Sequence, residues 1–232
     1  ITDSRADVLK ALFTPDNQYL ISSNFIGEIA IYEASSGKLL RNWQASAGKP
    51  VQSIALSPDG LRVYSGGGDG VLHAWNLQGD SIWTAAVGVN IWSVAVSPDG
   101  HKILTAAAQL PIKMWDDTGH LIRNCYGHLM ENYFVAWAPG GEQFVSCSWD
   151  KTAKIWNKDG QPLLTLPHPD GVFGADFTPD NRLVVTACRD KIIRVWEMQT
   201  GRMVNTIGMR TDVRPFFNSP SIASLDEISF DW

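Results

Sequence analysis

Several features that mark other classes of protein are scarce or missing in this sequence. Only three cysteines occur in 232 residues, Cys125, Cys147 and Cys188, and no two of them form a CxxC pair. Because three thiols cannot all pair in disulfides, we expect them to act as small apolar residues in a reducing compartment, which favours the cytoplasm. No run of about eighteen apolar residues is present, so we expect no membrane-spanning helix and no membrane partner.

Positive charge is also scarce. The chain has 19 lysines and arginines against 24 aspartates and glutamates, which gives a formal net charge of −5. Binding to phosphate backbones requires a basic surface, so this balance argues against a nucleic-acid partner. Apolar residues at helical spacing are missing as well, and the sequence therefore predicts an all-β protein.

A regular spacing of proline and an aromatic residue is what the sequence does contain. The pairs lie seventeen residues apart: Pro58 and Trp75, Pro98 and Trp115, Pro139 and Trp156, Pro179 and Trp196, and Pro15 with Tyr32. Successive prolines, ending at Pro220, are 40 to 43 residues apart. A period near forty indicates a repeat architecture in which each unit buries its apolar faces against its neighbours.

Residues 128–168 show most clearly what one repeat contains. Four short apolar or alternating segments lie at 133–137, 143–147, 152–156 and 163–166, and tight turns separate them. This pattern predicts one four-stranded antiparallel sheet per repeat. A sheet this small exposes two faces and two edges, and radial stacking of several sheets covers the faces. The predicted architecture is a β-propeller.

The segments 146–156 (SCSWDKTAKIW) and 186–196 (TACRDKIIRVW) resemble the WD-repeat (tryptophan–aspartate repeat) family, as do the SPDG turns at 57–60 and 97–100. The resemblance implies a single WD-repeat β-propeller domain over 1–232, built from four-stranded antiparallel blades. Six repeats are visible, at about 5–47, 48–87, 88–127, 128–168, 169–209 and 210–232. The last is incomplete, because Trp232 follows Pro220 by twelve residues. We therefore expect part of a longer protein, and a seventh blade outside the chain stays open.

The resemblance also implies a buried hydrogen-bond network of His, Ser or Thr, Asp and Trp in each blade. One set is His128, Ser146, Asp150 and Trp156; a second is His168, Thr186, Asp190 and Trp196; a third keeps Ser65, Asp69 and Trp75 but has Ala47 in place of the histidine. Ile26 and Gln109 occupy the Asp position in the two neighbouring repeats, which must close that turn differently. A buried set that recurs is structural, whereas a catalytic triad needs one exposed nucleophile.

No metal site or cofactor is expected. His73, His101 and His120 lie on separate repeats without the spacing of metal ligands, and we expect them to be solvated.

Partners of WD-repeat proteins usually dock on the narrower face, and the resemblance places particular positions there. Trp92, Tyr133 and Phe173 lie five residues beyond the histidine position, and Phe25, Trp149 and Arg189 precede the aspartate position. Glu131 and Arg214 are candidates for orienting a partner. Large aromatics and arginine dominate binding hot spots, so these residues form the predicted site. The alternative is that the rings pack into seams between blades.

We therefore expect a non-enzymatic scaffold or sensor module that binds a protein or peptide, or another domain of the same chain. The alternative is a propeller enzyme or redox protein with a site in the central channel. Such a site needs acidic or histidine side chains on several innermost strands, and Asp176 supplies the one carboxylate on those strands of the four best-matched repeats.

Overall fold

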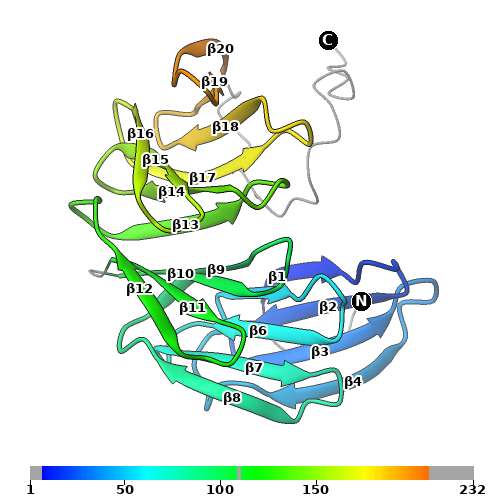
Figure 1. Ribbon diagram of the computed structural model, residues 1–232. Helices are drawn as coiled ribbons and strands as arrows, with labels where there is room; N and C mark the ends of the chain where they lie inside the picture. The colour runs from blue at the N-terminus through cyan, green and yellow to red at the C-terminus, as the bar shows by residue number, and fades with distance from the viewer. Residues whose placement is uncertain (1–6, 109–110, 209–232) are drawn as a thin grey trace. The chain divides into compact units, whose positions relative to one another are not determined.

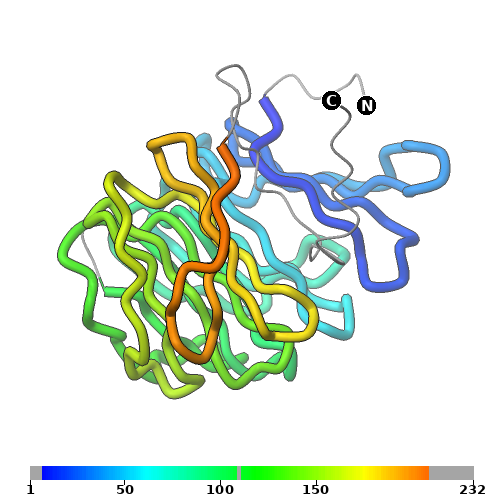
Figure 2. Tube along the Cα trace, turned by 90° about the horizontal axis from the view of Figure 1, so that it is seen from above, coloured from blue at the N-terminus to red at the C-terminus, as the bar shows by residue number. Residues whose placement is uncertain are grey.

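The computed structural model describes residues 7–108 and 111–208. These residues form twenty β-strands, arranged as five four-stranded antiparallel sheets (Figure 1). The described part of the chain contains no helix, and so none that could cross a bilayer. The chain completes each sheet before it begins the next (Figure 2). The predicted all-β fold with one four-stranded sheet per repeat is confirmed; the sixth repeat, 210–232, lies outside the described residues.

The chain divides into two compact units, Ile1–Tyr126 and Gly127–Trp232. The first unit holds β1 (Val8–Phe13), β2 (Tyr19–Asn24), β3 (Glu28–Glu33), β4 (Leu39–Gln44), β5 (Ser53–Leu56), β6 (Arg62–Gly66), β7 (Val71–Asn76), β8 (Ser81–Ala86), β9 (Ile91–Val96), β10 (Lys102–Ala107), β11 (Ile112–Asp116) and β12 (Leu121–Cys125). The second holds β13 (Asn132–Trp137), β14 (Gln143–Ser148), β15 (Thr152–Asn157), β16 (Pro162–Pro167), β17 (Val172–Phe177), β18 (Leu183–Cys188), β19 (Ile192–Glu197) and β20 (Met203–Gly208). The expectation of a single domain stays a prediction.

Burial differs systematically between the four strands of a sheet. The second strand is the most buried, as in β14 and β18, and the fourth strand, as in β4 and β20, is mostly exposed. The third strand alternates between buried and partly exposed positions, which is the period-2 pattern of a strand. The second and third strands of each sheet are therefore more buried than the fourth strand.

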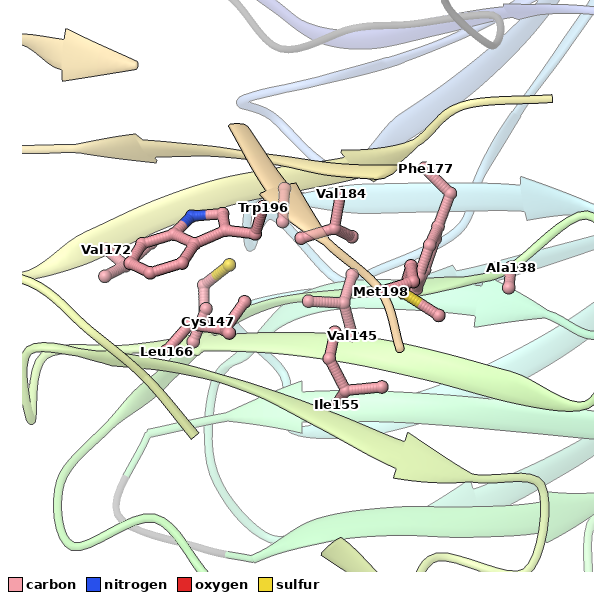
Figure 3. Close-up of a cluster of buried hydrophobic side chains, with 12 residues drawn as sticks. Ala138, Val145, Cys147, Ile155, Leu166, Val172, Phe177, Val184, Trp196 and Met198 are labelled. Carbon is pink, nitrogen blue, oxygen red and sulfur yellow. The ribbon is translucent and has the colours of Figure 1, made fainter. Parts of the chain in front are cut away.

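Apolar side chains fill the space between neighbouring sheets within a unit. In the second unit, Val145 and Ile155 of one sheet pack with Val184 and Trp196 of the next (Figure 3). Burial of such side chains stabilises the fold by about 1.5–3 kcal/mol each. The three cysteines are buried free thiols, and Cys147 belongs to this core.

The repeated SPDG turns are fixed by their own side chains. Ser57 Oγ accepts a hydrogen bond from the Arg62 amide at 2.9 Å, and Asp59 Oδ1 accepts one from the Leu61 amide at 2.9 Å. Gly60 takes a φ of 70°, a left-handed conformation that favours glycine. These contacts explain why the same four letters recur between first and second strands.

The turn that has Ile26 at the aspartate position is closed by Asn24. Its Oδ1 accepts hydrogen bonds from the amides of Ile26 at 3.2 Å and Glu28 at 2.9 Å. The expectation of a different closure is therefore met in the first repeat. Gln109, in the third repeat, lies outside the described residues.

Candidate partner-binding site

In the fourth sheet, a continuous chain of hydrogen bonds links the tryptophan of the third strand to the aspartate of the preceding turn. Trp156 Nε1 donates to Ser146 Oγ at 2.7 Å, and Ser146 Oγ lies 2.7 Å from His128 Nε2. His128 Nδ1 lies 2.8 Å from a carboxylate oxygen of Asp150, and the Leu129 amide donates to the same oxygen at 2.9 Å. A carboxylate can only accept, so Nδ1–H donates to the aspartate, which leaves Nε2 to accept a hydrogen bond from the serine hydroxyl.

The charge of Asp150 is stabilised within this chain. Burial by itself would raise the pKa of the Asp150 carboxyl, but hydrogen bonds from His128 and Thr152 outweigh it and hold the pKa well below its usual range. The carboxylate therefore stays ionised and ties the turn between β14 and β15 to the segment that carries His128.

The fifth sheet keeps only part of the predicted network. His168 Nε2 lies 2.8 Å from Thr186 Oγ1, which accepts a hydrogen bond from Trp196 Nε1 at 2.8 Å. His168 Nδ1 bonds to a backbone carbonyl rather than to a carboxylate. The predicted membership of Asp190 is wrong, because Arg194, four residues along, pairs with this carboxylate at 2.5 Å.

Two pKa values follow from this rearrangement. The guanidinium of Arg194 lowers the pKa of Asp190 to about 2. Burial lowers the pKa of His168 to about 4, because the hydrogen bond to the Leu166 carbonyl offsets only part of the cost of charging the buried imidazole. His168 is therefore a neutral residue of the core at pH 7.

In the second sheet, the histidine that packs against the tryptophan is His73 of β7. Trp75 Nε1 donates to Ser65 Oγ at 2.9 Å, as the network requires. His73 Nε2 lies 2.9 Å from Asp69, and the imidazole stacks on Trp75 with ring centroids 5.2 Å apart. Its side chain is only 15% exposed, so the prediction of a solvated histidine is wrong here. The predictions for His101 and His120, which are exposed, are confirmed.

A shared spacing links Asp69 to Asp190. In both sheets a basic residue four positions after the aspartate, His73 or Arg194, binds the carboxylate from the third strand. This spacing is visible in the sequence and could have identified both partners. The hydroxyls of Ser65, Ser146 and Thr186 are almost fully buried, so none of these three offers an accessible nucleophile.

In the second unit, three aromatic rings pack against one another. Tyr133 comes from β13, Trp149 from the turn between β14 and β15, and Phe173 from β17. The ring centroids lie 5.2 Å apart for Tyr133 and Phe173, 5.6 Å for Trp149 and Phe173, and 6.0 Å for Tyr133 and Trp149. We call these three residues the ring cluster. The structure thus brings together three of the predicted contact residues.

Backbone contacts fix the position of Trp149. Its amide donates to the carbonyl of Glu131 at 3.0 Å, and the Arg189 amide donates to the carbonyl of Gly171 at 2.9 Å. A Cβ on Gly171 would lie 2.7 Å from the indole of Trp149, so the ring is seated against this glycine. The guanidinium of Arg189 covers the indole at 5.0 Å from its centroid.

The ring cluster is partly open to solvent. Phe173 is 38% exposed, whereas Tyr133 and Trp149 are half-buried. The rings do pack where the fourth and fifth sheets meet, as the alternative predicted, yet they keep an accessible edge. The Tyr133 hydroxyl donates a hydrogen bond to Glu131 at 2.9 Å. Burial and, after it, the Glu131 carboxylate raise the pKa of the Tyr133 hydroxyl.

Two apolar residues next to the ring cluster were missed from the sequence. Leu129 is 90% exposed and Met130 is 51% exposed. Asp150 holds the Leu129 amide, and Ser148 Oγ donates to the Met130 carbonyl at 3.3 Å, which ties this segment beside Trp149. The signal available in the sequence was an apolar pair, Leu-Met, directly after the network histidine.

The other predicted contact residues are not part of this cluster. Trp92 is partly buried on β9, and Phe25 is exposed in the turn between β2 and β3; both belong to the first unit. Arg214 lies outside the described residues. Among residues 7–108 and 111–208, no group of three or more His, Cys, Asp or Glu side chains is placed to hold a metal ion.

Comparison with known proteins identifies the repeats. The family model "WD domain, G-beta repeat" matches residues 37–76, 119–157 and 160–197, about half of the chain. Jouberin of Mus musculus is 34% identical over 115 residues, which cover 47% of this chain and 11% of the relative. A periodic tryptophan protein 2 homolog of Dictyostelium discoideum is 26% identical over 210 residues, 87% of this chain and 23% of the relative.

A third relative, a coronin-like protein of Saccharomyces cerevisiae, is 36% identical over 81 residues, which cover 34% of this chain and 12% of the relative. The chain thus spans less than a quarter of the length of each of these three relatives. Each match runs from the fourth strand of one sheet to the third strand of the next and ends one residue after a tryptophan, Trp75, Trp156 or Trp196. The chain therefore belongs to the WD-repeat family, whose members generally serve as non-enzymatic scaffolds for protein interactions.

Proposed function

We propose that this chain is a non-enzymatic recognition module that binds a protein or peptide, or another domain of its own polypeptide, through the ring cluster. The observation that carries the proposal is the accessible edge of Tyr133, Trp149 and Phe173, continued by Leu129 and Met130. Contiguous apolar surface on a protein usually marks a contact site, and large rings bury much area at little entropic cost.

The buried network supports a binding role over a catalytic one. It consumes the hydroxyl and imidazole groups that a triad would need, and in the fourth sheet it holds the turn that presents Trp149. The alternative, an enzyme with a central-channel site, has no comparable support among the described side chains. Membership of the WD-repeat family agrees with a binding module, because scaffolds for protein interactions are common in that family.

The partner we propose is neither nucleic acid nor membrane, because the chain carries a net charge of −5. A cytoplasmic location and a role as a sensor or scaffold remain part of the proposal. The three reduced, buried thiols agree with a reducing compartment.

Affinity capture from a lysate of the source cells tests the proposal. One bait is the 232-residue chain, and a second carries Tyr133→Ser with Phe173→Ser. A matched control carries Leu163→Ser with Met203→Ser, which alters two residues of the outer strands that are each 48% exposed. All baits are first checked for similar melting temperatures.

We expect a partner that the original and control baits retain and the Tyr133/Phe173 variant loses. Equal capture by all three baits would contradict binding through the ring cluster. Capture of no protein by any of them would contradict binding of a separate protein partner.

A further inference from the structure

We propose that the segment bound at the ring cluster is acidic, with a carboxylate that pairs with Arg189 next to an apolar side chain that packs on the rings. This inference rests on the proposed function and names the chemistry of the partner. It is carried by the position of Arg189 and by the way neighbouring carboxylates are already used.

Arg189 is an exposed cation held in a defined place. Its backbone amide is bonded to Gly171, and its guanidinium lies over the indole of Trp149 at 5.0 Å from the ring centroid. The Arg189 guanidinium makes no hydrogen bond to any described residue, so its N–H groups remain available to a ligand. Arg189 forms no ion pair with any residue that the structure describes. A planar, fixed guanidinium is suited to two parallel hydrogen bonds with a carboxylate.

The acidic residues of the same two turns are already bound within their own sheets. Asp150 accepts hydrogen bonds from His128, the Leu129 amide and Thr152. Asp190 forms its ion pair with Arg194 at 2.5 Å. Neither carboxylate is therefore available to pair with Arg189.

The two turns also carry exposed lysines. The sequences are Trp149-Asp150-Lys151 and Arg189-Asp190-Lys191, and both lysines are exposed. Neither lysine pairs with an acidic residue in the described part of the chain. Although the whole chain is acidic, three exposed cations of these two turns, Lys151, Arg189 and Lys191, have no carboxylate partner among the described residues. An acidic segment would be attracted to this edge of the ring cluster.

Glu131 makes the site asymmetric. Its carboxylate accepts the hydroxyl proton of Tyr133, so the negative group lies at the tyrosine and the cation at the tryptophan. A bound segment would place its acidic residue towards Arg189 and a neutral or basic residue towards Glu131. The charges therefore predict an orientation for the segment as well as its composition.

A nucleic acid fits this site less well than an acidic peptide. The rings meet at interplanar angles of 49° to 66°, with centroids only 5.2–6.0 Å apart, so they pack edge to face against one another and do not offer parallel open faces. Bases bind by stacking on open aromatic faces. An apolar side chain needs only the exposed edges of the rings, together with Leu129 and Met130.

Selection of random twelve-residue peptides on the 232-residue chain tests the inference. We expect the selected peptides to carry Asp or Glu within about three positions of an aromatic or large aliphatic residue. Their affinity should fall about tenfold or more with Arg189→Gln, because a charge-assisted hydrogen bond is lost. The matched control Arg202→Gln removes an exposed arginine whose nearest carboxylate oxygen, on Glu197, is 3.7 Å away, and should leave affinity unchanged.

Charge reversal gives a second readout. Arg189→Glu should abolish binding of the selected peptides and restore it for peptides in which lysine replaces the acidic residue. Selected peptides without acidic residues, or acidic peptides that are insensitive to both Arg189 variants, would overturn the inference. If those peptides still lose affinity with Tyr133→Ser and Phe173→Ser, the proposed function survives; if they do not, it fails too. Recovery of no peptide overturns the inference as well.

Discussion

Gly171 lies directly against the indole of Trp149: a Cβ at position 171 would be 2.7 Å from the ring carbon Cε3. No side-chain atom is tolerated there unless Trp149 moves, and Trp149 also supports the guanidinium of Arg189. Gly171→Ala is therefore expected to displace the indole and to lower the affinity for the captured partner about tenfold. Affinity measured by titration calorimetry checks this.

Gly208→Ala is the matched control for that experiment, because a Cβ at Gly208 would meet no atom of the described residues within 4 Å. It should leave affinity unchanged. Unaltered affinity in the Gly171→Ala protein would show that the seat of Trp149 does not matter for binding.

Asp150 joins two segments through one carboxylate, which accepts hydrogen bonds from His128 and from the amides of Leu129 and Thr152. Asp150→Ala leaves these donors without a partner, at a cost of roughly 1–3 kcal/mol for each unsatisfied group. We expect a clear drop in melting temperature by calorimetry.

Glu142→Ala provides the comparison, since Glu142 forms an exposed ion pair with Lys158. Exposed pairs contribute about 0–1 kcal/mol, so the melting temperature should hardly change. Equal melting temperatures for Asp150→Ala and the original protein would contradict the network.

His73 stacks on Trp75 and binds Asp69 in the repeat where Ala47 stands in place of the network histidine. We expect His73→Ala to destabilise the protein by about 1–3 kcal/mol, because it removes the stack and the hydrogen-bond donor to Asp69. Chemical denaturation measures this. The exposed His120 supplies the control substitution, His120→Ala, which should be neutral; identical losses in the two variants would refute a special role for His73.

His168 makes stability depend on pH in a defined direction. Its pKa is lowered from 6.5 to about 4 in the folded protein, so the unfolded chain takes up the proton first as the pH falls. The contribution is complete above about pH 6.5 and is lost between there and about pH 4. His168→Asn should flatten this part of the profile of unfolding free energy against pH, and a profile that keeps its slope would argue against the assignment.

The fold could be predicted from the sequence because its signals are local and repeated. The SPDG turns are fixed by contacts such as that between Asp59 and the Leu61 amide, and the proline-to-tryptophan spacing covers one hairpin. These interactions involve residues close in the chain, so the fold of each repeat can be predicted from its own sequence.

The network and the site were predictable only in part. The alignment of the repeats predicted Asp190 as a partner of His168. The Asp190 carboxylate instead forms a direct ion pair with Arg194 of β19. Leu129 was missed because its exposure depends on how its amide is tied to Asp150, a contact across 21 residues. Such outcomes depend on competition between side chains, which a repeat pattern does not encode.

Hydroxyl-radical footprinting of the 232-residue chain with its captured partner tests the central claim most directly, because methionine and aromatic side chains report their own accessibility. Binding through the ring cluster predicts protection of Met130, Trp149 and Phe173, with unchanged oxidation of the exposed Phe13 and Met203. Protection of Phe13 or Met203 while Met130, Trp149 and Phe173 react as in the free protein would contradict it.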